Sequence, residues 1–169
     1  MRAHWFLLIA AITTIVTPLS ATSVRRLSFE ELIQTASTIV EGSVVDSRTY
    51  RTGDGKLILT SYTINVQENL KGSSGSTLTV TTVGGRIGNT ILHVAGVPVF
   101  QPGEKAVFFL EKTGMYTTVV GLNQGKFAIS NGAVSNSSAG LSFPDGGPAT
   151  PLKMPLDEFK RQIKLHSNR

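Results

Sequence analysis

The chain has 169 residues, a formal net charge of +5 and no cysteine. This length is typical of one domain, and the absence of cysteine excludes disulfide bonds and thiolate metal sites. The lysines and arginines are scattered, apart from the pair Arg25-Arg26, so the sequence predicts no nucleic-acid partner and favours an acidic partner.

The first 23 residues resemble a secretory signal peptide. Arg2 carries the positive charge that precedes the apolar part, and residues 5–16 are uncharged and mostly apolar. This stretch is shorter than the roughly 20 residues of a membrane-spanning helix. Pro18 follows it, and cleavage after Ala21 or after Ser23 fits the small residues there. We therefore expect an exported protein, secreted or periplasmic, with no transmembrane segment in the mature chain; an uncleaved membrane anchor is the alternative.

A short amphipathic helix is predicted directly after this leader. Ser28 and Glu31 have the spacing of a capping box, in which each side chain binds the backbone N–H of the other residue. Leu32 and Ile33 continue an apolar stripe with helical spacing. From Thr38 the spacing of the apolar residues changes to two, which is typical of a strand.

About seven short strands are predicted between residues 38 and 134, separated by glycine-rich turns. Asp54-Gly55 and Asn131-Gly132 are typical of hairpin turns. The run AVFFLE, residues 106–111, is apolar at five successive positions and predicts a strand buried on both faces. Lys71-Gly72 ends one long strand, where we expect the glycine to supply the backbone freedom of a corner.

The C-terminal part combines a predicted loop with a predicted helix. Residues 135–152 are rich in glycine, serine and proline and lack periodicity, so they predict a long surface loop. Residues 153–169 predict an amphipathic helix and a tail, with Leu156, Phe159 and Ile163 along one side of the helix.

Few residues of the mature chain are suited to catalysis. His93 is the candidate general base, because His166 lies in the terminal tail and no G-x-S-x-G nucleophile pattern occurs. A strand histidine that faces solvent is the commoner interpretation. Glu41 and Glu104 would suit the acid pair of a glycosidase, although solvated strand and turn charges are the favoured interpretation. No pattern of metal ligands is present, so we expect neither a metal nor another cofactor.

The stretch GGRIGN, residues 84–89, is rich in glycine but lacks a phosphate-binding signature. It matches neither G-x-G-x-x-G nor a P-loop, and no helix pattern follows it. We expect these glycines to form tight turns, with Arg86 at the surface. A face of the predicted barrel, or a loop such as Gly84 to Asn89, is the candidate contact surface for a partner.

Three short motifs occur in the order found in a known family. They are Val40-x-Gly42-x-Val44, Leu70-Lys71-Gly72 and Phe100-x-x-Gly103-Glu104. With these motifs, the region from Leu27 to Ile129 resembles the OB-like barrel of netrin-type and tissue-inhibitor-of-metalloproteinase modules, and uncharacterised exported bacterial proteins that share the pattern. The inhibitors of that family bind the zinc of a protease through an amino-terminal cysteine, which this chain lacks, so the resemblance implies no inhibitory residue here.

The order of the predicted elements indicates a mainly β fold of the β-rich α+β class, and the resemblance implies that the strands form a barrel. We expect an open antiparallel barrel of five to seven strands, with a short N-terminal helix and a C-terminal helix. The expected organisation is a signal peptide at 1–23, an OB-like barrel domain at 24–134, the loop at 135–152, and the C-terminal helix and tail at 153–169.

By elimination, these observations favour a binding or accessory role outside the cytoplasm. We expect an exported, non-enzymatic module that acts on an exported or envelope protein, or on an acidic polymer. A small hydrolase that uses His93 as general base is one alternative, and a purely structural accessory domain is another.

Overall fold

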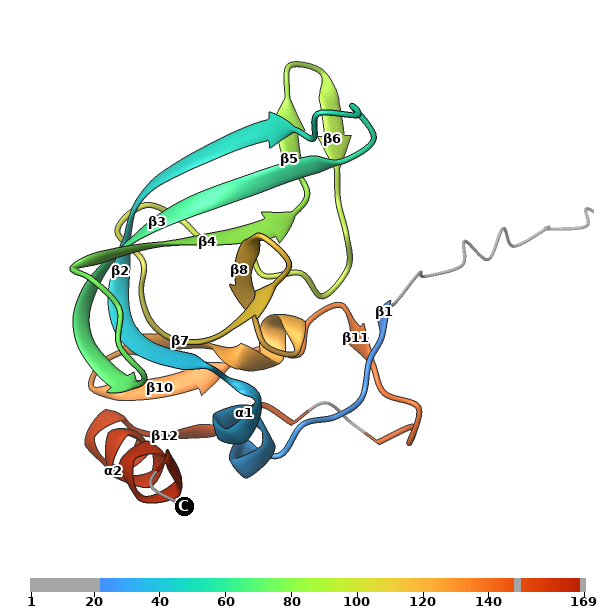
Figure 1. The fold of residues 1–169 in the computed structure, drawn as a ribbon. Helices are drawn as coiled ribbons and strands as arrows, with labels where there is room; N and C mark the ends of the chain where they lie inside the picture. The colour runs from blue at the N-terminus through green and yellow to red at the C-terminus, as the bar shows by residue number, and fades with distance from the viewer. Residues whose placement is uncertain (1–21, 148–149, 168–169) are drawn as a thin grey trace, which may run out of the picture.

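The computed structural model describes residues 22–147 and 150–167, and among these residues eight strands form one antiparallel sheet that curls on itself (Figure 1). The predicted leader therefore lies outside the described residues, except for Thr22 and Ser23. The strands of the sheet are β2 (Thr38–Arg51), β3 (Ile58–Lys71), β4 (Thr77–Val83), β7 (Lys105–Thr113), β8 (Tyr116–Val119), β9 (Lys126–Ser130), β10 (Ala133–Asn136) and β12 (Lys153–Pro155). The β-rich α+β class is confirmed, with a short helix near each end of the described chain.

The remaining elements lie outside this sheet. They are the helices α1 (Phe29–Thr35) and α2 (Leu156–Ser167), the hairpin of β5 (Gly85–Ile87) and β6 (Thr90–Leu92), the parallel pair β1 (Thr22–Ser23) and β11 (Leu141–Ser142), and the 3-10 turn η1 (Leu122–Gly125). In Figure 1 the two helices lie at one end of the molecule and the β5–β6 hairpin lies at the other. Among the described residues, no helix combines the length and apolarity needed to cross a membrane.

Five strands surround a barrel interior that stays open along one line. The strand order is β4-β3-β2-β7, and β8 pairs with β7 beyond the part of that strand that pairs with β9. Strand β4 lies alongside β8, but no ladder joins the two strands, so the barrel is open between them. Strands β9, β10 and β12 continue the sheet, and α2 packs against β10 and β12.

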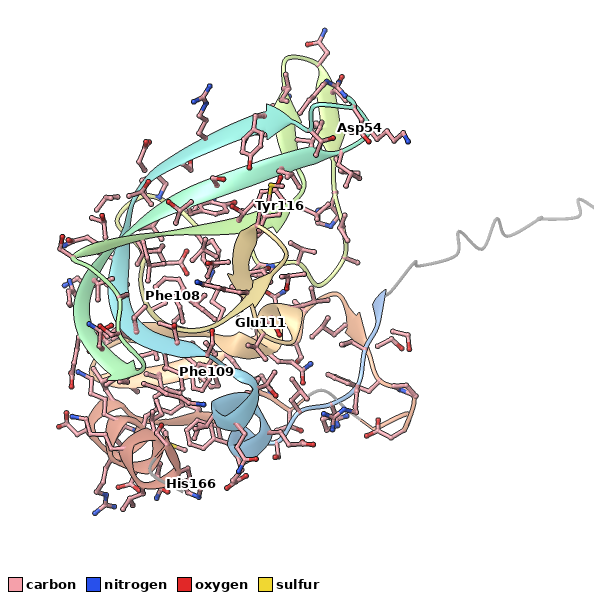
Figure 2. All side chains as sticks on the ribbon, in the orientation of Figure 1. Asp54, Phe108, Phe109, Glu111, Tyr116 and His166 are labelled. Atoms are coloured by element: carbon pink, nitrogen blue, oxygen red, sulfur yellow. The ribbon has the colours of Figure 1, made fainter. Side chains whose placement is uncertain are left out.

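Strand β7 separates two apolar cores. Phe108 and its inward-facing neighbours join the cluster inside the barrel, whereas Val107 and Phe109 join the cluster between the sheet and the helices. Figure 2 shows Phe108 and Phe109 on opposite sides of the strand. Every residue from Ala106 to Leu110 has 0% of its surface exposed, which explains why this strand is apolar at successive positions.

Four phenylalanines hold the helices on the sheet. The rings of Phe127 and Phe159 are 4.6 Å apart between centroids, and Phe29 lies 4.9 Å from Phe159. Phe109 completes the group at 5.2 Å from Phe127. Because the four rings come from α1, β7, β9 and α2, this aromatic cluster joins segments from both ends of the chain.

Helix α1 has side-chain partners at both of its ends. The predicted capping box is present: the Ser28 hydroxyl accepts a hydrogen bond from the Glu31 N–H at 3.1 Å, and the Glu31 carboxylate accepts one from the Ser28 N–H at 2.8 Å. That backbone bond, together with the Arg25 guanidinium, lowers the pKa of Glu31 to about 2. At the other end, the Lys71 ammonium donates to the carbonyl of Ile33 at 2.6 Å.

The Lys71-Gly72 corner is therefore packed against the junction between α1 and β2. Gly72 has a φ of +71°, and a Cβ there would lie 2.7 Å from the carbonyl oxygen of Ser37. A side chain at this position would clash with the backbone as well as strain it. The corner has a structural role in holding the helix.

Helix α2 starts later than the predicted segment, because residues 153–155 pair with β10 as strand β12. Phe159 and Ile163 are fully buried, as their helical spacing indicates. Lys160 forms ion pairs with Glu41 and with Glu68, the latter at 2.8 Å. Burial alone would lower the pKa of Lys160, but its hydrogen bonds to these two carboxylates outweigh burial and raise the pKa above its ordinary value.

The segment predicted as a surface loop at 135–152 is anchored at several points. Strand β10 continues to Asn136, and Phe143 is only 7% exposed. The Arg26 guanidinium lies 4.1 Å above the Phe143 ring and donates to the carboxylate of Asp145 at 3.1 Å. The N-terminal segment therefore covers this loop.

Phe159→Ala tests the aromatic cluster. The cavity left in a fully buried site is expected to lower the free energy of unfolding by about 3–5 kcal/mol. Met115→Ala, at a side chain that is 87% exposed, is the matched control and should change it by less than about 0.5 kcal/mol. Denaturant unfolding followed by circular dichroism measures both. Equal losses would mean that α2 is not held by this cluster.

Glu68→Gln tests the ion pairs of α2. The hydrogen bond from Lys160, followed by that from Lys164, lowers the pKa of Glu68 below 4.5, so the charged form stabilises the fold above that pH. The variant should be less stable than the wild type at pH 7. This difference should shrink as the pH falls through the lowered pKa, because the wild-type carboxylate is then protonated as well. Glu111→Gln, at a carboxylate without an ion pair among the described residues, is the control. A stability difference that is the same at pH 7 and pH 2 would contradict the assignment.

Candidate functional site

The two glycines after β4 turn the chain across the end of the barrel (Figure 1). Gly84 has a φ of +113°; its N–H donates to the carbonyl of Ile58 at 2.8 Å, and its carbonyl accepts from the Thr60 hydroxyl at 2.7 Å. Gly85 has a φ of +133°, and a Cβ there would lie 2.7 Å from Cγ2 of Thr49. Both positions therefore need glycine for the backbone angle and for a close approach, which is to the carbonyl of Leu92 in β6 at Gly84 and to β2 and β3 at Gly85.

This crossing creates a hollow of about 220 Å³, which we call the hairpin groove. It lies between the end of β4, the β5–β6 hairpin and the segment at 93–99. Six aliphatic side chains line it: Val83, Ile91, Leu92, Val94, Val97 and Val99. Tyr62 and Thr82 contribute to its wall, and Arg86 and His93 are its basic residues.

Several aliphatic side chains of the groove are open to solvent. Ile91 and Val99 are each 57% exposed and Val83 is 37% exposed. Single exposed aliphatic residues are ordinary on protein surfaces, but a group of them in one concave site is typical of a contact surface. This grouping distinguishes the hairpin groove from the rest of the described surface.

The groove brings together the two features of the sequence that were candidates for function. Arg86, from the glycine-rich stretch, stands directly opposite Ile91 in the β5–β6 ladder, and His93 follows Ile91 by two residues. Both basic side chains are exposed, and neither forms an ion pair or hydrogen bond with another described residue. No aspartate or glutamate lines the groove.

The arrangement lacks the partners that a catalytic histidine needs. Among the described residues, the His93 side chain forms no hydrogen bond or ion pair with a hydroxyl or carboxylate. Glu41 and Glu104 are each paired with a different lysine: Glu41 contacts Lys160, and Glu104 contacts Lys126 at 2.6 Å. Nor does any group of three or more potential metal ligands occur in the described part of the chain.

His166, which was expected in a terminal tail, is part of α2. Its Nδ1 lies 2.9 Å from the carbonyl oxygen of Gln162, one helical turn earlier. It lies at the end of the molecule opposite the hairpin groove (Figure 2).

A second hollow adjoins the hairpin groove on the other side of the end of β4. We call it the seam hollow, because it lies along the open line between β4 and β8. Leu59, Tyr116 and Thr118 contribute to its lining, and it shares Thr82 and Val83 with the hairpin groove. The two hollows therefore adjoin each other at the end of β4.

Sequence reasoning did not identify Val83, although a signal for it exists. In β4 the residues Leu78 and Val80 face the barrel interior, so the alternation places Val83 on the outward-facing phase. An aliphatic residue on the polar phase of a strand, directly before two glycines, indicates a surface contact. Tyr116 carries no such signal, because its position in the seam hollow depends on the approach of β8 to β4.

A third hollow lies beneath the N-terminal segment, and two of its polar lining residues, Gln124 and Asn136, form hydrogen bonds within the protein. The Gln124 side chain accepts from the N–H of Leu27 at 2.9 Å and donates to the carbonyl of Arg25 at 3.2 Å. Asn136 lines the same hollow and donates to the carbonyl of Gln124. These hydrogen bonds hold the N-terminal segment in place.

Comparisons of the chain with protein-family models, with curated proteins and with solved structures found no match.

Gly85→Ala tests whether the crossing shapes the groove. We expect it to destabilise the fold by more than Gly88→Ala, which shares the positive φ but has open space around its Cα. The backbone strain should cost about 1 kcal/mol at Gly88, whose φ of +56° lies in the left-handed helical region, and more at Gly85, whose φ of +133° lies outside it; the clash with Thr49 and Thr60 adds to the loss only at Gly85. Denaturant unfolding gives the two losses, and amide NMR shifts of residues 91–94 report the shape of the groove. Equal losses with unchanged shifts would show that the close approach is unimportant.

Proposed function

We propose that this protein is an exported, non-enzymatic binding module that holds a protein or polymer partner at the hairpin groove, outside the cytoplasm. One observation carries the proposal: exposed aliphatic side chains line a concave site whose basic residues, Arg86 and His93, have no partner among the described residues. Basic groups beside an apolar surface suit a ligand that brings its own negative charge.

The geometry around His93 supports binding over hydrolysis. A general base acts on a nucleophile within about 3 Å, or through one water, and in known catalytic triads a third group orients the histidine. His93 lines the groove and forms no hydrogen bond or ion pair with another described residue. Its ring is instead available to donate or accept a hydrogen bond with a bound partner.

Kinship with netrin-type and tissue-inhibitor-of-metalloproteinase modules is also part of the proposal. It is supported by the open barrel and by what the three shared motifs do in it. A Cβ at Gly42 would lie 2.7 Å from the carbonyl oxygen of Asn65, and Gly103 has a φ of +84° in a turn where Glu104 accepts from the N–H of Gln101. All these contacts serve the fold, so the kinship adds no active site to this chain.

A pull-down from envelope extract tests the proposed function. The bait is the chain from Val24 onward, with the double variant Arg86→Glu/Ile91→Ser as the groove-defective form. The double variant Val45→Ser/Arg48→Glu makes the same chemical changes at exposed positions of β2 and is the matched control. We expect a captured partner that the groove variant loses, by about tenfold or more, and that the control retains.

The same proteins, assayed with ester, peptide and glycoside substrates, test the alternative. Hydrolysis that His93→Ala abolishes would overturn the non-enzymatic assignment. If the groove variant and the control captured the partner equally well, the hairpin groove would not be the binding site.

A further inference from the structure

The hairpin groove is too small to enclose a whole small-molecule ligand. Its volume is about 220 Å³, whereas pockets that bury a drug-sized ligand typically hold about 300–1,000 Å³. The groove is also open, because Ile91 and Val99 in its wall are each 57% exposed. A hollow of this kind suits a single anchoring group that belongs to a larger partner.

The wall of the groove is aliphatic. Its six aliphatic side chains come from the end of β4, from β6 and from the segment at 93–99. Tyr62, the only phenylalanine, tyrosine or tryptophan in the lining, is just 4% exposed. An aliphatic side chain therefore matches this wall, whereas a sugar ring would find no benzene-type ring to stack on. The lining favours a protein partner over a polysaccharide.

The basic groups lie next to this wall. Arg86 stands directly opposite Ile91 in the β5–β6 ladder, and the Cβ atoms of directly opposite residues are about 4.5–5.5 Å apart. His93 is exposed and lines the groove as well, and no aspartate or glutamate does. The groove therefore offers an apolar surface and basic groups about one residue apart. A ligand that matches both carries its negative charge directly beside its aliphatic group.

The end of a polypeptide chain meets this requirement in the most compact way. A C-terminal residue carries its side chain and its free carboxylate on the same Cα, so the two groups reach neighbouring positions of the groove together. In an extended internal segment, by contrast, adjacent side chains point to opposite faces, so an acidic residue next to the aliphatic anchor would face away from the groove. A chain end also fits a small hollow better, because an internal segment needs room to enter and to leave.

We propose that the hairpin groove binds the C-terminal residue of a protein partner whose chain ends in leucine, isoleucine or valine. The side chain of that residue would pack against Ile91 and the rest of the aliphatic wall, and its carboxylate would accept hydrogen bonds from the Arg86 guanidinium. His93 would supply a second donor to the carboxylate. This inference rests on the proposed function and names the chemistry of the protein partner.

Three peptides of one sequence test the two parts of this recognition. The first, acetyl-Gly-Ser-Gly-Ser-Leu, has a free carboxylate; the second ends in the leucine amide; the third has serine in place of leucine and keeps the free carboxylate. Binding is followed by the amide NMR spectrum of the chain from Thr22 onward, which keeps every described element. We expect the first peptide to shift the amides of Arg86, Ile91 and His93. It should bind about threefold or more tightly than the second peptide and about tenfold or more tightly than the third.

Three variants locate the two contacts. Arg86→Gln should remove the preference for the free carboxylate over the amide, because the charged donor is gone. Arg48→Gln makes the same chemical change at an exposed position of β2 and should keep the preference. Ile91→Ser should weaken both leucine peptides by about threefold or more, because it removes part of the aliphatic wall. Equal binding of the acid and the amide, an unchanged preference in Arg86→Gln, or shifts confined to another face would overturn the inference.

Further outcomes separate this inference from the proposed function. If a partner captured from envelope extract depends on the groove but the free carboxylate gives the leucine peptide no advantage, the C-terminal chemistry is wrong and the binding module remains. If the internal sequence in acetyl-Gly-Ser-Leu-Asp-Gly-amide binds as tightly as the free acid, the partner presents an internal acidic residue and the inference is overturned. If no partner and no peptide depends on the groove, both proposals fail.

Discussion

The complete burial of β7 on both faces is the constraint on which the rest of the structure depends. Its inward side chains fill the barrel, and its outward side chains, with Phe109 at the centre, form the surface that receives both helices. One strand thereby couples two cores that would otherwise be independent. The barrel positions the end of β4 and the β5–β6 hairpin. The shape of the hairpin groove therefore depends on the packing of the β7 side chains inside the barrel.

The helices and the hairpin groove occupy opposite ends of this arrangement. At the helix end, charges are neutralised within the chain: Lys160 lies between Glu41 and Glu68, and Lys71 caps α1. At the groove end, the basic side chains have no such partners among the described residues. Groups that are already paired contribute to stability, whereas unpaired groups beside an apolar surface are available for recognition.

The elements governed by local signals were predictable from the sequence. The capping box located α1 because Ser28 and Glu31 satisfy each other's backbone within one turn, and the apolar run at 106–110 indicated a strand buried on both faces. Residues 153–155 were assigned to the C-terminal helix, because the ladder with β10 that makes them a strand is a long-range contact. The burial of Phe143 likewise depends on Arg26, which is remote in the sequence and carries no local mark of that contact.

In the candidate site, too, local signals were predictable and long-range contacts were not. Arg86 and His93 were each singled out, but only the path of the chain through Gly84 and Gly85 brings them to one groove. The alternation of β4 alone could have revealed Val83, because it places this aliphatic residue on the outward-facing side of the strand. The seam hollow was inaccessible to such reasoning, because it exists only where two strands distant in sequence approach without pairing.

The strap formed by residues 24–28 has a consequence for the order in which the chain acquires its structure. Its anchors come late: Leu27 binds Gln124, 97 residues further on, and Arg26 binds Asp145, 119 residues further on. A chain emerging from its N-terminus would expose this strap until nearly all of the remaining sequence had followed, since contacts of such separation form after local ones. This strap, although it lies near the start of the described chain, would thus be among the last segments to dock, and it would stay accessible until the barrel was complete.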